Sequence, residues 1–306
     1  YTQAYTLSLH DALPICDEAG FRAASEAVIK EERQKNHHLL ANDLERLLYG
    51  DRSTRSLRKM PDMPNLPSSK DSGLALLEER AVIREEKDII LSDATQTTLS
   101  EIIHEHNRED LLRSYGVQPA QKLLFCGPSG CGKTLAAEVI AHSLSLPLVI
   151  VRLDSVISSF LGETAANLRK VFDYVSQNTV VALFDEFDAL VKDRGDAADH
   201  GELKRSVNAV LQMLDSYRGD SLLIATTNYE SILDQAVWRR FDETLRFELP
   251  NLEQIKRLLS LKLSGIRREF DPGSHEVASL FKGMSHAEIE RVLRRAIKQM
   301  ILSGQE

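Results

Sequence analysis

The stretch GPSGCGKT occupies residues 127–134, directly after the apolar run KLLFC and directly before a run with helical periodicity. It fits the pattern G-x-x-x-x-G-K-[ST] in a strand–loop–helix context. Glycines at such a turn let backbone N–H groups curl around phosphate oxygens, and the positive end of the following helix dipole favours an anion. The stretch therefore predicts a phosphate-binding loop in an α/β fold.

The polar side chains of this loop suit a nucleoside triphosphate with a metal ion. Lys133 would bring a positive charge to the β- and γ-phosphates, and the Thr134 hydroxyl would reach Mg²⁺. Cys131 is interpreted as a small spacer, with a regulatory thiol as the alternative. The predicted nucleotide-binding residues are Gly127, Pro128, Ser129, Gly130, Cys131, Gly132, Lys133, Thr134 and, from the motif described next, Asp185.

A second motif, VVALFDEFDAL at residues 180–190, is an apolar strand that ends in Asp185 and Glu186. Asp185 at a strand tip can hold the Mg²⁺ shell, and Glu186 can polarise a water for in-line attack on a γ-phosphate. An acidic pair alone could be an ordinary solvated strand end. Because this pair follows a phosphate-binding loop in the same predicted sheet, it indicates hydrolysis of the nucleotide.

Short apolar runs alternate with helical stretches through the middle of the chain. The runs are KLLFC at 122–126, LVIVRL at 148–153, VVALFD at 180–185, LLIATT at 222–227 and TLRFEL at 244–249. Strands separated by helices in this way form a parallel sheet covered on both faces. The sequence thus predicts an α/β fold with a five-stranded parallel sheet between helices, followed after Pro250 by a small all-α domain.

Composition divides the chain into six segments. Residues 1–16 contain ALPI, which the adaptor sequence GCTCTTCCGATC encodes, and are interpreted as a sequencing-adaptor artefact, so we expect the true N-terminus elsewhere. Helical periodicity marks residues 17–49, and a stretch rich in proline, serine and basic residues marks 50–73 as a flexible linker. A helical lead-in at 74–121 precedes the α/β domain at 122–250 and the α-helical domain at 251–306.

The overall composition excludes several classes of protein. The chain has 306 residues, of which 42% are hydrophobic and 27% charged, and no apolar run approaches the roughly 18 residues of a membrane span. A net charge of −8 disfavours nucleic acid as a partner. The three cysteines have no metal-ligand spacing, which suits a reducing compartment and predicts a cytoplasmic protein.

Residues 122–306 resemble a AAA+ ATPase module, closest to the classic AAA clade, in the order and spacing of five motifs. These are GPSGCGKT, LFDEFD, IATTN, LDQAVWRRFD and GMSHAEIE. The resemblance implies an ATPase that uses Mg²⁺ and forms a homo-oligomer, typically a hexameric ring. It also implies that Asn228 orients the attacking water and that Arg239 and Arg240 act as arginine fingers on a neighbouring subunit's nucleotide. A turn-forming asparagine and solvated cations at a helix end are the alternatives.

The stretch SSFLGETAANLRKVF, residues 158–172, matches the pore-loop element of protein-remodelling members of this family. Phe160 and Leu161 could grip an extended chain through apolar contacts, and Gly162 would let the loop turn tightly. The resemblance implies a motor that unfolds, remodels or translocates a protein substrate, possibly beside a separately encoded protease. Packing of Phe160 beneath a loop is the structural alternative. The functional alternatives are action on nucleic acid, as a loader or transposition helper, and a nucleotide-dependent assembly switch.

Overall fold

The computed structural model describes residues 27, 28, 30, 66–69, 73–157, 163–188, 200–229, 235–264, 266 and 270–303, with the side chains of 200–207 excepted. The elements discussed here all lie within Met60–Glu306. The predicted segment 1–16, nearly all of the predicted helical segment 17–49 and most of the predicted linker lie outside the described residues.

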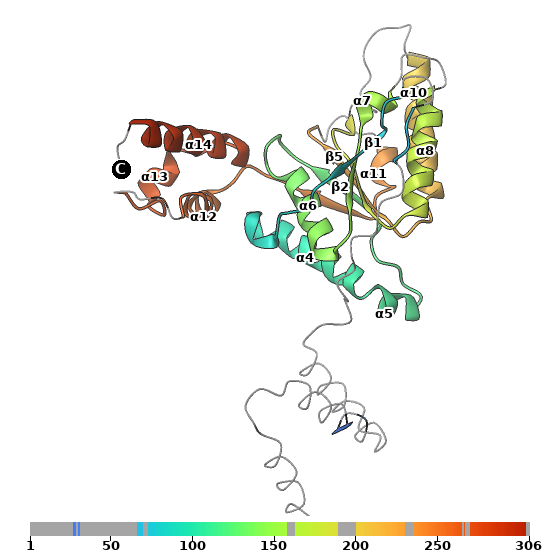
Figure 1. Ribbon diagram of the computed structural model, residues 1–306, viewed down its shortest axis with the longest axis horizontal. Helices are drawn as coiled ribbons and strands as arrows, with labels where there is room; N and C mark the ends of the chain where they lie inside the picture. The colour runs from blue at the N-terminus through green and yellow to red at the C-terminus, as the bar shows by residue number, and fades with distance from the viewer. Residues whose placement is uncertain are drawn as a thin grey trace, which may run out of the picture. The chain divides into compact units, whose positions relative to one another are not determined.

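A six-stranded sheet forms the centre of the α/β part (Figure 1). Its strands, in spatial order, are β1 (Leu77–Arg80), β3 (Leu148–Val151), β4 (Val181–Phe184), β5 (Leu222–Thr227), β2 (Lys122–Cys126) and β6 (Glu243–Arg246). Neighbouring strands from β3 to β6 pair in parallel, whereas β1 pairs antiparallel with β3. The predicted α/β class is confirmed, and β1 makes the sheet mixed.

Helices cover both faces of the sheet (Figure 1). Successive side chains of each strand point to opposite faces, so apolar strands need cover on both. On one face the buried side chains of Leu123 and Phe125 share a core with α4 (Asp93–Asn107) and α6 (Lys133–Leu144). On the other face Leu124 and Cys126 share a core with helices α8 and α10. Helix α8 spans Glu163–Gln177, and α10 spans His200–Ser216. The apolar runs identified as strands are therefore buried on both faces, which explains why they do not alternate with polar residues.

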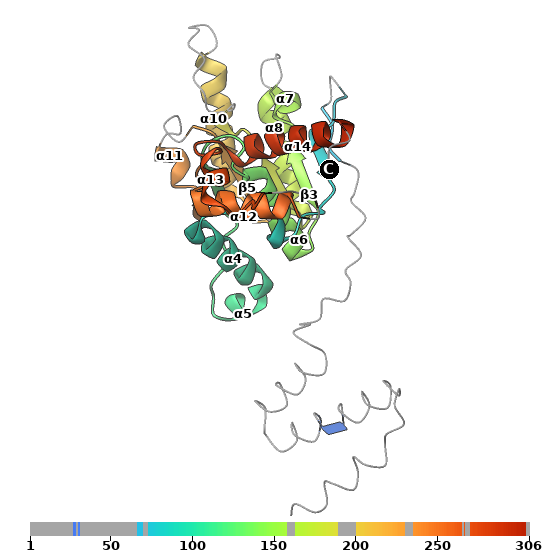
Figure 2. The same cartoon turned by 90° about the vertical axis from the view of Figure 1, so that its left-hand side faces the viewer.

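Within the described residues, these elements are connected by the short helices η1 (Glu86–Asp88), α5 (Glu109–Ser114), α7 (Leu153–Val156) and α11 (Gln235–Trp238). Helices α12 (Leu252–Lys262), α13 (His275–Ser279) and α14 (His286–Ser303) lie together (Figure 2). Their buried side chains form a core of their own. That core consists of Ile255, Leu258, Leu259, Leu263, Ala278, Ile289 and Leu293. Helix α12 begins at a capping box, in which the Asn251 side chain accepts the Gln254 N–H at 2.9 Å.

The structure corrects two boundaries. The predicted helical lead-in at 74–121 contains β1, whose preceding residue Leu76 and first residue Leu77 are fully buried. The predicted linker at 50–73 extends too far, because Ser68 pairs with Ala75 and the Leu76 N–H donates to the Pro67 carbonyl at 2.9 Å. The two buried leucines attach this segment to the core that also contains α8 residues.

Candidate functional site

The loop of residues 127–132 joins the carboxyl end of β2 to Lys133, the first residue of α6. Gly127 has a φ of +141°, and a Cβ atom added there would lie 1.9 Å from the Phe247 carbonyl oxygen, so only glycine fits. Gly132, the N-cap of α6, has a φ of +99°. The loop thus turns sharply around the N-terminus of a twelve-residue helix, which is the backbone geometry that binds phosphate.

The side chain of Lys133 is buried and lies against this loop. Its Nζ donates to the carbonyls of Gly127 at 2.6 Å and Pro128 at 2.9 Å, and to Asn228 Oδ1 at 2.8 Å. Burial lowers the pKa of Lys133, and the nearby thiol and carboxyl groups oppose that shift less strongly. Two predicted site residues from distant parts of the chain, Lys133 and Asn228, are therefore in direct contact.

Two hydroxyl groups hold the carboxylate of Asp185, one from each side. Thr134 Oγ1 donates to Asp185 Oδ2 at 3.1 Å, and Thr226 Oγ1 donates to Asp185 Oδ1 at 2.6 Å. The predicted pair Thr134 and Asp185 thus comes together beside the N-terminus of α6. Hydroxyl and carboxylate oxygens are ligands that Mg²⁺ prefers, so this donor set fits that ion.

Glu186 follows Asp185 in a backbone conformation that non-glycine residues rarely adopt. Its φ is +55°, and its N–H donates to Thr226 Oγ1 at 3.0 Å. The next N–H, of Phe187, donates to the Thr226 carbonyl at 2.8 Å. Backbone conformations of this kind persist where surrounding contacts enforce them, and they concentrate at functional sites.

The thiol of Cys131 is buried within the loop and belongs to the core around α6. Burial raises the pKa of Cys131, with Lys133 acting in the opposite direction. A raised pKa lowers the thiolate fraction at neutral pH and hence the reactivity of the thiol. The contacts therefore favour the interpretation of Cys131 as a spacer that packs under the loop.

The two arginines at the end of α11 differ in their surroundings. Arg240 is paired with Asp215, whose Oδ2 lies 3.0 Å from both Nε and Nη2, and its Nη1 donates to the Ala236 carbonyl. The side chain of Arg239 is exposed and makes no hydrogen bond or ion pair within the part of the chain that the structure describes. Of the two predicted fingers, Arg239 is the more exposed, and Arg240 is held in an ion pair.

The C-terminal helices also contact the loop, a contact that was not among the predictions from sequence. The Ala287 N–H, in the first turn of α14, donates to the Gly130 carbonyl at 3.0 Å. Gly130 has a φ of +77°, and a Cβ atom added there would lie 2.9 Å from Ser285 Oγ. The pattern GMSHAEIE could have signalled this contact only through the family resemblance, because nothing in its composition points to a distant loop.

The predicted pore-loop residues are not described in the structure, and one residue of the site was not predicted. Phe160, Leu161 and Gly162 lie outside the described residues, between α7 and α8 in the sequence. Thr226, which contacts both residues of the acidic motif, was missed. Its sequence signal was its place in IATTN, but a threonine inside an apolar strand is usually read as a strand former.

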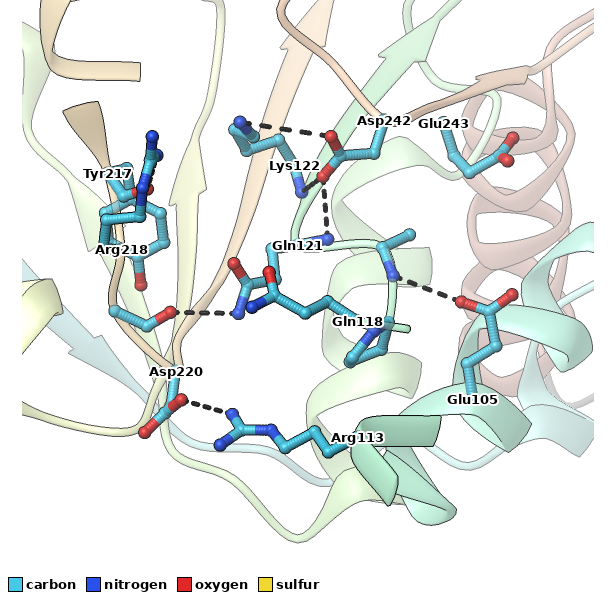
Figure 3. A pocket seen from close by; sticks show the side chains of 13 residues that line it. Glu105, Arg113, Gln118, Gln121, Lys122, Tyr217, Arg218, Asp220, Asp242 and Glu243 are labelled. Carbon is cyan, nitrogen blue, oxygen red and sulfur yellow. Dashed lines mark hydrogen bonds and ion pairs between the residues drawn. The ribbon is translucent and has the colours of Figure 1, made fainter. Parts of the chain in front are cut away.

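A surface pocket of about 670 Å³ lies at the amino ends of β2, β5 and β6, the sheet edge opposite to the loop (Figure 3). Its polar groups are largely paired with one another. Arg113 contacts Asp220 at 2.6 Å, and Asp242 Oδ2 accepts the backbone N–H groups of Gln121 at 2.9 Å and Lys122 at 2.8 Å. These bonds anchor the chain where it enters β2, so we interpret the pocket as structural.

A glycine loop between a parallel strand and a helix, facing an Asp–Glu pair at the same sheet edge, defines a P-loop nucleotide-binding protein. The model of the "ATPase family associated with various cellular activities (AAA)" matches residues 123–249. The AAA family ATPase y4kL of Sinorhizobium fredii is 43% identical over 283 residues, covering 92% of this chain and 84% of that protein. The chain belongs to the AAA family of ATPases.

Two further relatives share only part of their length with this chain. A Methanothermobacter marburgensis protein with the provisional name 26S proteasome regulatory subunit homolog is 30% identical over 185 residues, which are 59% of this chain and 50% of that protein. The ATP-dependent zinc metalloprotease FtsH of Mycoplasmopsis synoviae is 30% identical over 206 residues, 65% of this chain and 31% of that protein. Among the described helices, none has the length and apolar character needed to cross a membrane.

Proposed function

We propose that this chain hydrolyses ATP at the site formed by residues 127–134, Asp185, Glu186 and Asn228. The observation that carries the proposal is the contact of Asp185 with Thr134 at 3.1 Å, beside a glycine loop at a helix N-terminus. It joins a phosphate cradle to a metal-binding carboxylate and to the adjacent carboxylate, Glu186. Membership of the AAA family of ATPases supports the same activity.

In this proposal the loop N–H groups and Lys133 bind the phosphates, and the Thr134 and Asp185 oxygens hold Mg²⁺. Bound Mg²⁺ supplies positive charge that stabilises the charge developing on the phosphate oxygens. Lys133 Nζ, which donates to Gly127, Pro128 and Asn228 here, would instead donate to phosphate oxygens. A strong acceptor of that kind suits an ammonium group that burial already destabilises.

Glu186 acts as the general base, and Asn228 orients the attacking water. Glu186 accepts a proton from the water while the water oxygen bonds to the γ-phosphorus. The bond from that phosphorus to the β,γ-bridging oxygen breaks in line, which gives ADP and inorganic phosphate. Holding Glu186 by its backbone at the strand end fixes the direction from which it meets the water.

Glu186→Gln tests this assignment. We expect hydrolysis to fall by roughly 10²–10⁴-fold, because the amide cannot accept the proton, while the affinity for ATP is retained. Lys133→Ala should instead lose ATP binding. The exposed Glu248→Gln, on the chain segment after β6, is the matched control and should hydrolyse ATP like the wild type. Phosphate release and binding of a fluorescent ATP analogue measure the two effects, and full hydrolysis by the Glu186 variant would contradict the mechanism.

We further propose that the chain assembles into a ring, most simply a homohexamer, that pulls a protein substrate through its centre. In the chain, Phe160, Leu161 and Gly162 follow β3 and the short helix α7, and β3 ends at the sheet edge that also bears the loop of residues 127–132. In this proposal, movement at that edge during hydrolysis is passed along the chain to these three residues. Two relatives carry names tied to proteolysis, as a proteasome regulatory subunit homolog and as a metalloprotease, which favours a protein substrate and a separate protease as partner.

Phe160→Ala separates this motor from other uses of the same ATPase site. In a threading motor the variant should hydrolyse ATP at the wild-type rate but lose ATP-dependent unfolding of a captured protein. The captured substrate comes from Glu186→Gln, which should hold ATP and retain the bound chain. A Phe160 variant that unfolds its substrate normally would exclude the pore-loop role, and capture of nucleic acid in place of protein would favour a nucleic-acid motor.

A further inference from the structure

Thr226 contacts the acidic motif but has no role in the mechanism proposed above. It belongs to β5, the strand next to β4, and its side chain is 1% exposed. In the ladder Ala225 pairs with Phe184, so Thr226 stands level with the point where β4 ends and Asp185 begins. The β-strand register thus brings a hydroxyl to the acidic motif from the neighbouring strand.

The hydroxyl of Thr226 uses both of its hydrogen-bonding roles on this motif. It donates its one hydrogen to Asp185 Oδ1 at 2.6 Å and accepts the Glu186 N–H at 3.0 Å. Because the single hydrogen is committed to the carboxylate, the lone pairs face the N–H, and the two bonds fix each other's direction. Thr134 contacts the other oxygen, Oδ2, so that Asp185 cannot rotate without losing one of the two hydroxyls.

The same residue also holds the unusual backbone of Glu186. The φ of +55° is bracketed by two bonds to Thr226, from the Glu186 N–H to the hydroxyl and from the Phe187 N–H to the carbonyl. Only the first of these depends on the side chain. Removal of the hydroxyl would therefore release both the Asp185 carboxylate and one of the two restraints on the Glu186 backbone.

We propose that Thr226 is a positioning residue that sets the orientation of Asp185 toward Mg²⁺ and of Glu186 toward the attacking water. The inference rests on the proposed function, since it assigns Thr226 a role in that same site. Thr226 does not touch ATP in this proposal. It acts as a hydrogen-bond partner behind a metal ligand, a kind of contact whose loss typically weakens metal affinity or activity by about 10–100-fold.

Thr226→Val tests the hydroxyl, because valine keeps the shape and the β-branch, and Thr226→Ser is the conservative variant that restores the hydroxyl. We expect Thr226→Val to raise the Mg²⁺ concentration needed for half-maximal binding of a fluorescent ATP analogue by roughly 10-fold. Binding of the same analogue in EDTA should be unchanged. At saturating Mg²⁺ the kcat should fall by about 10–100-fold with KM for ATP nearly constant, and Thr226→Ser should recover most of both losses.

Thr244→Val, the same substitution at a partly buried position of β6 in the same sheet, controls for replacing a strand threonine with valine and should leave Mg²⁺ dependence as in the wild type. Thr226→Ala replaces the valine variant if thermal unfolding shows that the latter does not fold. Equal losses in the serine and valine variants, or wild-type Mg²⁺ dependence and kcat without the hydroxyl, would overturn the proposal. Loss of hydrolysis in Glu186→Gln with no effect of Thr226→Val would defeat this inference alone, whereas an active Glu186→Gln would defeat the proposed function itself.

Discussion

Some residues in this molecule adopt conformations or surroundings that are unfavourable in free energy, and contacts with neighbouring residues offset the cost. A non-glycine residue at a left-handed φ, as at Glu186, costs about 1–3 kcal/mol and persists only where other bonds hold it. Thr226 supplies two such bonds here. Lys133 is a second example, because its ammonium group is buried and its pKa is lowered, yet three acceptors surround it. The polar atoms of the nucleotide site are thus already oriented by the fold.

His286, the first residue of α14, makes the stability depend on pH. Burial lowers the pKa of His286 below its ordinary value, and the Glu290 charge and the Ile90 backbone oppose that shift less strongly. A cation at a helix N-terminus is also disfavoured. Because the folded-state pKa lies below the unfolded value of 6.5, its contribution to stability is complete above pH 6.5 and is lost as pH falls through the folded-state pKa.

We therefore expect His286→Gln to flatten the pH dependence of unfolding below about pH 6.5, since glutamine takes up no proton. Chemical denaturation from about pH 7.5 to about pH 5 measures the free energy of unfolding of each protein. The control is His275→Gln, which removes an exposed histidine that also begins a helix, α13. An equal slope with pH in the wild type and the His286 variant would show that this imidazole does not titrate with folding.

At the scale of elements, the apolar runs located β2 to β6 well because strands buried on both faces are continuously apolar. Strand β1 was missed since its sequence, LEER, carries only one buried side chain, Leu77, and three exposed charged residues. Its pairing with β3 depends on a tertiary contact that no local pattern encodes. Edge strands are commonly charged in this way, which discourages pairing with other chains.

The candidate site likewise contains residues that sequence motifs predict and contacts that depend on tertiary structure. Residues 127–134, Asp185 and Glu186 were predicted because each sits in a motif with a chemical reason for its spacing, whereas Asn228 was predicted from the family resemblance. Thr226 and the contact between Ala287 and Gly130 were not found, since they arise from sheet register and from the packing of α14. The difference between Arg239 and Arg240 also needed the structure, because only Arg240 meets Asp215.

Tyr217 joins the end of α10 to the start of β5, and its removal tests how that connection is stabilised. The buried Tyr217 hydroxyl accepts the Ser221 N–H at 2.9 Å and lies 3.0 Å from the Ser221 carbonyl. Burial raises the pKa of Tyr217 to about 12, so the hydroxyl stays protonated throughout the neutral range. Tyr217→Phe should lower the free energy of unfolding by about 1–3 kcal/mol, because it leaves a buried N–H without its acceptor.

Denaturant unfolding at neutral pH measures the Tyr217 effect. Tyr115→Phe is the matched control, because Tyr115 follows α5 with 79% of its surface exposed, and its loss of a hydroxyl should change stability little. Similar stabilities for the two variants would mean that water replaces the lost hydrogen bond at Ser221.

At the scale of the whole molecule, the C-terminal helices form a core of their own but contact the nucleotide loop through the Ala287 N–H and the Gly130 carbonyl. If ATP binds at this loop as proposed, a change in the loop would reach the first turn of α14 through this hydrogen bond. Ile90, between η1 and α4, also packs against the same C-terminal core. Two cores that meet at the proposed nucleotide-binding loop would allow small changes in that loop to rotate one core against the other.

In the proposed ring, Arg239 of one subunit acts on the nucleotide of its neighbour, and mixing two inactive variants tests this role. Glu186→Gln and Arg239→Ala should each be nearly inactive alone, the second because an arginine finger is worth roughly 10³–10⁵ in rate. A 1:1 mixture that exchanges subunits should recover activity. In a ring of head-to-tail contacts, about one interface in four would join an intact Glu186 to an intact Arg239.

The mixture should thus reach up to about a quarter of the wild-type rate, and specific activity should rise with protein concentration as the assembly forms. Mixing Glu186→Gln with Lys133→Ala is the matched control. An active site needs Glu186 and Lys133 from the same subunit, and neither variant has both residues intact. Recovery must therefore be absent in the control. If the Arg239 mixture also stays inactive although labelled subunits exchange, Arg239 does not act across an interface, and its exposure at the end of α11 needs another explanation.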